Sequence, residues 1–196
     1  MSKYFDYFPK IKYGEKVMRD ITKNVRVFDD IENDPYAFMP YTVNDGESPE
    51  EIAQYYYESV DHVWIVYQSN AIVDPYFQWP LSNKALEETM IRKYRALAEQ
   101  STETEMSDQS VLQWTQQSTE SMFDNVVYYY DAEGTKISVD TFKNGSTNST
   151  IVSSDWTAMR IYDEELQLNE DKRNIRLLNN QYLNVATKNL KRVLNV

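Results

Sequence analysis

The chain of 196 residues carries a formal net charge of −11 and contains no cysteine, while aromatic residues make up 14% of it, including 16 tyrosines. The acidic balance argues against nonspecific binding to nucleic acid, whose phosphates attract Lys and Arg, and the lack of cysteine excludes disulfides and thiol chemistry. Tyrosine combines a large contact area with a hydroxyl that tolerates water, so its abundance favours either an interface or an aromatic-rich core.

The length allows one domain, or a small domain with a second region attached. The first residues contain no apolar run typical of a signal peptide, and no apolar stretch reaches the roughly 18 residues of a membrane-spanning helix. We therefore expect a soluble protein that stays in the compartment where it is made.

Residues 1–40 are predicted to form an extended N-terminal arm. Aromatic residues crowd before Pro9, and prolines recur at positions 35 and 40 with little helical periodicity, which is typical of a segment laid across a surface. That surface belongs either to the chain's own domain or to a partner, and we favour a partner. Deleting residues 1–35 is then expected to leave a soluble fold. The candidate partner-binding residues of the arm are Tyr4, Phe5, Phe8 and Tyr13.

Residues 41–82 are predicted to form a small β-α-α-β domain. A short β-prone run ends at a turn sequence of Asn, Asp and Gly. Ser48 then has the position of an N-cap, and Glu51 three residues later completes a capping box. A second short helix is expected over residues 62–69, and a returning strand over residues 72–79.

Three further segments follow in the sequence. Residues 83–122 are predicted to form a helix and a polar segment, and residues 123–162 a small antiparallel β region with two Gly-containing turns. Residues 163–196 are predicted to form one long C-terminal helix, because they contain no Gly or Pro and their apolar residues repeat near heptad spacing. The candidate partner-binding residues of this helix are Ile175, Leu178, Tyr182 and Val185.

The end of the chain differs in charge from the rest. From residue 170 onward the net charge is about +4, against about −15 for the residues before it. Apolar residues interleave with these charges, which favours a basic amphipathic helix over a nucleic-acid-binding tail. We expect this helix to meet an acidic partner or the acidic body of its own chain.

The sequence indicates no enzyme, no metal and no cofactor. His62 is the single histidine and lies among apolar residues, so a packing or surface role is expected. No Cys/His cluster has metal-ligand spacing, and no Gly-rich phosphate loop or nucleophile elbow is present. Carboxylate pairs such as Glu50 and Glu51 fall at helix starts, where helix electrostatics explain them. A hydrolase within residues 101–157 is the alternative that stays open.

The segment YTVNDGESPEEIAQYYYESVDHVWIVYQSNAIVDPYFQWPLS resembles a LysM domain in its opening strand, its turn, the Ile-Ala pair of its first helix and the Asn near the end of its second. Together with the aromatic start YFDYFPKIKY and the later YDEELQLNEDKRNIRLL, it resembles the LysM-containing baseplate wedge subunit of contractile-tailed bacteriophages. The likeness leaves residues 101–157 unassigned. The residues that it assigns to the LysM scaffold are Ser48, Ile52, Ala53, Trp64, Asn70, Pro75, Trp79 and Pro80.

The resemblance implies an α+β fold and a structural role, as a component of a phage tail baseplate wedge that joins neighbouring wedges through protein–protein contacts. It implies other wedge subunits as partners, without nucleic acid, membrane or small-molecule ligand, and assembly in the bacterial host cytoplasm into the virion tail baseplate. The alternative is a peptidoglycan-binding LysM module. The single copy of the module argues against that alternative, since tight sugar binding by such modules usually depends on repetition.

Overall fold

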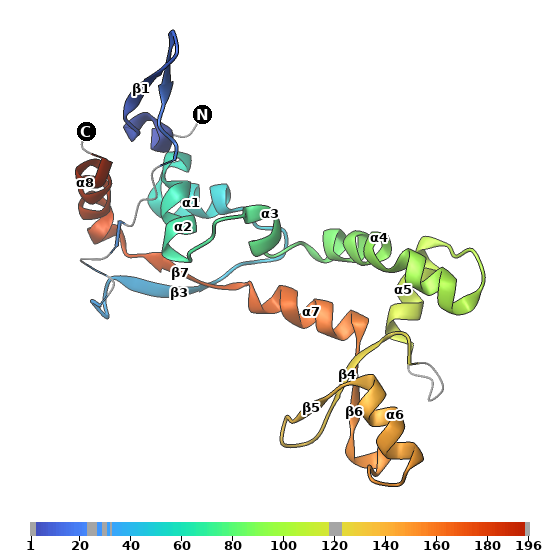
Figure 1. Cartoon of the computed structure of the whole chain (residues 1–196). Helices are drawn as coiled ribbons and strands as arrows, with labels where there is room; N and C mark the ends of the chain where they lie inside the picture. The colour runs from blue at the N-terminus through green and yellow to red at the C-terminus, as the bar shows by residue number, and fades with distance from the viewer. Residues whose placement is uncertain (1–2, 23–26, 29–30, 32, 118–122, 195–196) are drawn as a thin grey trace. The chain divides into compact units, whose positions relative to one another are not determined.

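The computed structural model describes residues 3–22, 27–28, 31, 33–117 and 123–194. The chain divides into two units, of which unit 1 comprises Met1–Pro80 with Lys172–Val196 and unit 2 comprises Leu81–Asp171. Unit 2 is thus inserted into the sequence of unit 1. Both units combine helices with small antiparallel sheets, which confirms the predicted α+β class (Figure 1).

The centre of unit 1 is a β-α-α-β arrangement. Its two strands pair antiparallel, from Phe38 opposite Leu178 to Thr42 opposite Asn174. Buried side chains of both helices and of the second strand share one hydrophobic core, in which Leu177 is fully buried. The elements are β3 (Phe38–Thr42), α1 (Pro49–Tyr57), the 3-10 turn η2 (Val60–His62), α2 (Val63–Ser69) and β7 (Asn174–Leu178).

The predicted returning strand over residues 72–79 is wrong. These residues form a turn and the short helix α3 (Pro75–Gln78), which Asp74 caps by accepting the Tyr76 N–H at 3.1 Å. Proline at the first helical position needs no donor there, so an Asp-Pro step starts a helix as readily as it interrupts a strand. The strand that completes the β-α-α-β arrangement is β7, which follows unit 2 in the sequence.

The N-terminal segment is not an extended arm throughout. It forms the 3-10 turn η1 (Lys3–Tyr7) and a hairpin of β1 (Lys10–Tyr13) and β2 (Lys16–Arg19). Four buried side chains among the described residues of 1–35 belong to the hydrophobic core of unit 1, so deleting residues 1–35 would open that core, against our expectation. These core residues are Phe8, Val27, Phe28 and Ile31.

The predicted single C-terminal helix is also wrong, because the segment changes structure twice. Within β7 the residues alternate, with Ile175 buried and its neighbours Asn174 and Arg176 exposed, a period of two that only a strand produces. Pairing with β3 therefore overrides a sequence that has no Gly or Pro to mark the ends of the helices. The observed elements are α7 (Ile161–Asp171), β7, the 3-10 turn η4 (Asn180–Tyr182) and α8 (Leu183–Leu194).

Unit 2 contains two small hydrophobic clusters. One lies between helices and includes Trp114, and the other packs the ring of Phe142 against Tyr129 of a three-stranded antiparallel sheet in the order β5-β4-β6. The predicted antiparallel region is therefore present, but its second turn is helical. The elements before α7 are α4 (Asn83–Thr102), α5 (Asp108–Gln116), β4 (Val126–Tyr130), β5 (Lys136–Ile137), α6 (Val139–Thr147), the 3-10 turn η3 (Ser153–Asp155) and β6 (Thr157–Arg160).

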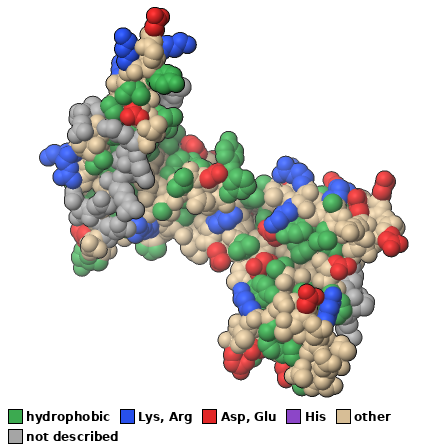
Figure 2. Space-filling view, viewed as in Figure 1, with side chains coloured by type: hydrophobic (Ala, Val, Ile, Leu, Met, Phe, Trp, Pro, Cys, Tyr) green, Lys and Arg blue, Asp and Glu red, His purple; other side chains and the backbone are tan. Residues whose placement is uncertain are grey.

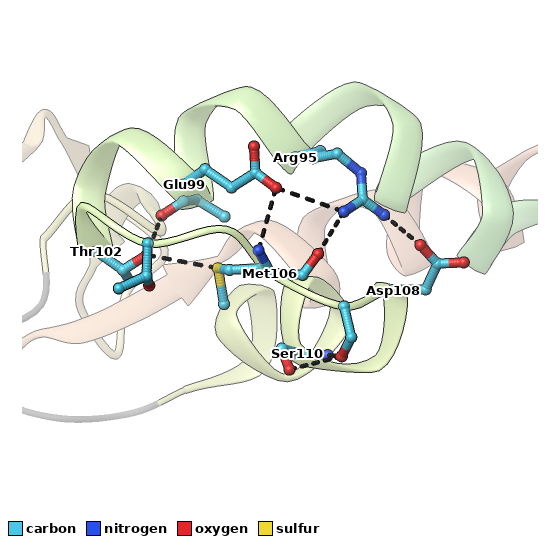
Figure 3. A network of polar contacts seen from close by, with 9 residues as sticks. Arg95, Glu99, Thr102, Met106, Asp108 and Ser110 are labelled. Carbon is cyan, nitrogen blue, oxygen red and sulfur yellow. Dashed lines mark hydrogen bonds and ion pairs between the residues drawn. The ribbon is translucent and has the colours of Figure 1, made fainter.

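A polar network fixes the corner between α4 and α5 (Figure 3). Arg95 pairs with both Glu99 and Asp108, and its guanidinium also donates to the Met106 carbonyl at 2.5 Å. The Glu99 carboxylate accepts the Met106 N–H at 3.2 Å. Arg95, Glu99 and Asp108 thus each have a charged partner, and the backbone of Met106 in the loop is bonded on both its N–H and its carbonyl. No helix among the described residues is long and apolar enough to cross a membrane.

Candidate functional site

The first turn of α1 is built as the sequence predicts. The Ser48 hydroxyl accepts the Glu51 N–H at 3.2 Å, while the Glu51 carboxylate accepts the Ser48 N–H at 2.7 Å, so both halves of the capping box are present. The Ser48 hydroxyl also donates to that carboxylate at 2.8 Å, and the two hydrogen bonds from the Ser48 backbone and hydroxyl lower the pKa of Glu51 because they favour its charged form. The cap fixes the point at which the chain turns from β3 into the helix.

Asn70 connects the end of α2 with β7. Its amide nitrogen donates to the carbonyls of Val66 at 2.8 Å and Arg176 at 2.9 Å, and its amide oxygen accepts the Arg176 N–H at 2.8 Å. Arg176 returns a hydrogen bond of 2.6 Å from its guanidinium to the Ser69 carbonyl. The predicted scaffold role of Asn70 therefore has a geometric basis, and Arg176 is the partner that the sequence did not reveal.

Trp79 connects the end of α3 with the turn that follows β3. Its indole N–H donates to the Glu47 carbonyl at 3.0 Å, while the Glu47 carboxylate accepts the Tyr41 hydroxyl at 2.8 Å and the Asn44 N–H at 2.9 Å. Burial, followed by the hydrogen bond to Glu47 and its charge, raises the pKa of Tyr41 to about 12. The turn after β3 is thus tied both to the strand and to α3.

The remaining residues predicted to belong to the LysM scaffold also lie in unit 1. Ile52, Ala53 and Trp64 are buried in its core, Pro75 is the first residue of α3, and Pro80 is buried at the end of the unit. The eight predicted scaffold residues are therefore brought together, although the strand that unites them is β7.

The predicted contact residues of the N-terminal segment separate into two groups. Tyr4 stacks on Trp64 with ring centroids 5.6 Å apart, and Phe8 is 3% exposed, so both side chains already pack within unit 1. Phe5 and Tyr13 are 51% and 76% exposed. Only the second pair can contact a partner without a change in the core.

The predicted contact residues near the C-terminus separate in the same way. Ile175 and Leu178 are core residues of β7. The Tyr182 hydroxyl donates to Asp34 at 2.5 Å, which ties η4 to the segment before β3. Val185 on α8 is 42% exposed and remains available to a partner.

Three of the most exposed apolar side chains lie on or just before α3, in a segment that sequence analysis assigned to a returning strand. Val73, Tyr76 and Phe77 are 89%, 90% and 77% exposed, and we call these three residues the α3 knob. The backbone beneath them is held in place, since the Gln78 amide oxygen accepts the N–H groups of Val73 at 2.7 Å and Asp74 at 2.8 Å. A local hydrogen-bonded framework thus presents three apolar side chains to solvent.

The β1–β2 hairpin is the second feature that sequence analysis missed, and we call residues 10–19 the ribbon. Its register, with Tyr13 opposite Lys16, leaves a two-residue loop that begins at Gly14 with φ +61°. A positive φ at this position is what a type II′ hairpin loop requires. Alternating apolar and basic residues on both sides of a Gly were the signal that could have revealed it. Figure 2 shows basic side chains flanking the ribbon and hydrophobic side chains along it.

The His62 side chain packs against a neighbouring aromatic ring, as the sequence predicted for a histidine among apolar residues. The imidazole meets the Tyr57 ring edge to face, with centroids 6.2 Å apart, beside a cavity of about 180 Å³ that Ser59 and Asp61 also line. The Ser59 hydroxyl accepts the Asp61 N–H at 3.3 Å and so caps the 3-10 turn η2. Among the described residues, no group of three or more His, Cys, Asp or Glu side chains is placed to hold a metal ion.

These observations describe a molecule with a hydrogen-bonded scaffold and exposed apolar side chains that are suited to contact with other proteins. Residues 4–193 match the model of the family described as Base plate wedge protein 53. The chain therefore belongs to this family and is a structural component of a phage baseplate wedge.

One relative is the Baseplate wedge protein gp53 of Enterobacteria phage T4. The two sequences are 27% identical over 100 compared residues, and the match covers 46% of this chain and 51% of that protein. The chain thus spans about half the length of the curated relative that it matches. The predicted baseplate wedge role is confirmed by these similarities, whereas the LysM assignment stays a prediction.

Proposed function

We propose that the chain joins neighbouring baseplate wedges by binding other wedge subunits through the exposed apolar features of unit 1. The observation that carries this proposal is the α3 knob, whose three side chains are more than three-quarters exposed on a hydrogen-bonded framework. Aromatic side chains that are held in place lose little conformational freedom on binding, and such residues dominate the energetics of protein interfaces.

The distribution of exposed apolar residues supports unit 1 as the binding unit. Of the large hydrophobic residues that are exposed, only Leu97, Val127, Val152 and Leu168 of those described lie in unit 2. Those in unit 1 include the α3 knob, several residues of the ribbon and the aromatic side chains of Tyr36 and Tyr55. An exposed apolar surface of this extent is typical of a subunit that is covered on assembly.

The β-α-α-β arrangement of β3, α1, α2 and β7 is, in this proposal, a LysM-like scaffold used as a protein-contact module. Its own side chains bond the turn after β3 and the end of α2 to the rest of unit 1. The scaffold supplies orientation, and the α3 knob and ribbon supply contact. The chain acts without chemistry of its own, and assembly takes place in the host cytoplasm before the tail is complete.

The proposal is tested by the joining of wedges purified without this chain, followed by sedimentation velocity. Adding the wild-type chain is expected to convert single wedges into joined species. The variant Tyr76→Ser/Phe77→Ser should weaken joining at least about tenfold, as expected for the loss of interface aromatics. Val127→Ser/Val152→Ser in unit 2 is the matched control and should join wedges like the wild type.

Two results would overturn the proposal. Wedges that join to the same extent in the absence of the chain would remove its joining role. Equal joining by the Tyr76→Ser/Phe77→Ser variant and the wild type would remove the role of the α3 knob.

A further inference from the structure

The ribbon has two chemically different faces, and both are largely exposed among the described residues. Directly opposed residues of an antiparallel pair project on the same side, so the register places Ile11 with Met18 and Tyr13 with Lys16 on one face. That face is apolar, and its residues Ile11, Tyr13 and Met18 are 42%, 76% and 50% exposed. Every residue of β1 is exposed, as are the first three of β2.

The opposite face of the ribbon is basic. It pairs Lys10 with Arg19 and Lys12 with Val17. With Lys16 on the first face and Glu15 in the loop, residues 10–19 carry a net charge of +3 in a chain whose total is −11. The ribbon is therefore a positively charged element that extends from an acidic protein (Figure 2).

Hydrogen bonds and an ion pair connect the base of the ribbon to the rest of unit 1 and fix the direction in which the ribbon leaves it. The Arg19 guanidinium donates to the Phe8 carbonyl at 2.8 Å and to the Asp6 carbonyl at 2.5 Å, and it pairs with the Asp6 carboxylate at 3.3 Å. Phe8 itself is buried in the core. A two-stranded hairpin without further contacts is only marginally stable in water, so this ribbon gains order when a partner covers it.

We propose that the ribbon inserts into a groove on another baseplate wedge protein, with one apolar wall against Ile11, Tyr13 and Met18 and one acidic wall against Lys10 and Lys12. The inference rests on the proposed function and names the chemistry of the partner. Opposite charge steers such a contact and selects the partner. The same lysines repel a second ribbon, because like charges on neighbouring strands oppose edge-to-edge pairing, which disfavours a dimer formed through two ribbons.

The wedge-joining experiment tests the charge of the groove. Lys10→Glu/Lys12→Glu should reduce the apparent affinity of joining about tenfold and flatten its dependence on salt, because two charges that faced acidic groups become repulsive. The matched control is Lys84→Glu/Lys188→Glu, which makes the same change of charge at two exposed lysines elsewhere and should join wedges like the wild type. Circular dichroism of all variants checks that they are folded.

A photo-crosslinking residue at position 13 tests the identity of the occupant. Mass spectrometry of joined wedges should find the crosslink on another wedge protein, next to a segment rich in Asp and Glu. A crosslink to a second copy of this chain, to its own residues or to a basic segment would overturn the inference. So would a Lys10→Glu/Lys12→Glu variant that joins wedges with wild-type affinity and salt dependence while the wild type is active. A wild type that fails to join wedges would instead overturn the proposed function and the inference with it.

Discussion

At the scale of single residues, the stability of unit 1 depends on polar side chains that connect distant parts of the sequence. Asn70 bonds α2 to β7 across 106 positions, and the buried Tyr57 hydroxyl donates to the Leu178 carbonyl at 3.0 Å across 121 positions. Removing one partner leaves the other polar group without a hydrogen bond, and the cost of taking a buried group out of water is then not compensated. Each of these bonds therefore restricts which residue can occupy the position.

Replacing Asn70 is expected to destabilise unit 1. Asn70→Ala removes the three hydrogen bonds that the Asn70 side chain makes to Val66 and Arg176, which should lower the free energy of unfolding by about 2 kcal/mol. Urea unfolding followed by circular dichroism measures this change. Asn184→Ala, at an exposed position of α8, is the control and should change the free energy by less than about 0.5 kcal/mol. Equal stability of the two variants would contradict the role of Asn70.

The buried hydroxyl of Tyr57 is expected to make the free energy of unfolding depend on pH in the alkaline range. Burial raises the pKa of this hydroxyl well above its ordinary value of 10, with the Leu178 hydrogen bond acting in the opposite direction. A folded-state pKa that is raised gives stability that is complete below pH 10 and is lost as the pH rises toward the folded-state pKa, because only the unfolded chain ionises there. The free energy of unfolding should therefore decline above pH 10.

The matched variants are Tyr57→Phe and Tyr55→Phe, since the neighbouring Tyr55 is 84% exposed. Tyr57→Phe should reduce the alkaline decline and cost about 1–2 kcal/mol at neutral pH through the unpaired carbonyl, whereas Tyr55→Phe should match the wild type. Urea titrations of the wild type and both variants, at pH 7 and above pH 10, measure these differences in the free energy of unfolding. An alkaline decline that is unchanged in Tyr57→Phe would contradict the assignment.

At the scale of elements, the sequence predicts well where local signals and tertiary packing agree. The capping box of Ser48 and Glu51 places the start of α1 correctly, because its hydrogen bonds are local. The identity of β7 depends on pairing with β3 from the other end of the chain, and no local signal distinguishes its run from a helical stripe. The ribbon and α3 were missed for a different reason, since Gly14 was not considered as a hairpin loop and the strand predicted over residues 72–79 ran through Pro75, which starts a helix.

Gly145 illustrates a glycine required by packing rather than by a turn. It lies within α6, and a Cβ added there would stand 2.4 Å from Cδ1 and 2.6 Å from Cγ1 of Ile151. Gly145→Ala gains about 1 kcal/mol of helix propensity but overpacks the contact by about 1–3 kcal/mol, so a net loss of stability is expected.

A double-mutant cycle with Ile151→Ala tests this account. When Ile151 is shortened, Gly145→Ala should become stabilising, because the helix propensity remains and the clash is gone. Thermal unfolding of the four proteins measures the coupling between the positions. Additive effects of the two substitutions would contradict the proposed clash.

At the scale of the whole molecule, the two units differ in charge and in exposed apolar surface. Residues 81–171 contain 17 acidic and seven basic residues, a net charge of −10, which leaves −1 for unit 1. Charge keeps a surface solvated, whereas exposed apolar groups favour association. This division supports the proposal that unit 1 makes the contacts, and it agrees with the position of the α3 knob and the ribbon. The abundance of tyrosine favoured either an interface or an aromatic-rich core, and only the burial of each side chain separates exposed residues such as Tyr13 from core residues such as Phe8.

The ends of unit 2 are held together by Asn169. Its amide nitrogen donates to the Leu81 carbonyl at 2.9 Å, and its amide oxygen accepts the Leu81 N–H at 2.8 Å. Both ends of the inserted segment therefore lie close to one another, and a short flexible linker can replace residues 81–171 without stretching unit 1.

The most direct test of the central claim is wedge joining by this shortened chain, measured by sedimentation velocity after near-ultraviolet circular dichroism confirms that it is folded. Unit 1 alone is expected to join wedges purified without the chain, because it carries the scaffold, the α3 knob and the ribbon. A folded unit 1 that leaves the wedges single, while the full chain joins them, would contradict the claim that unit 1 makes the joint.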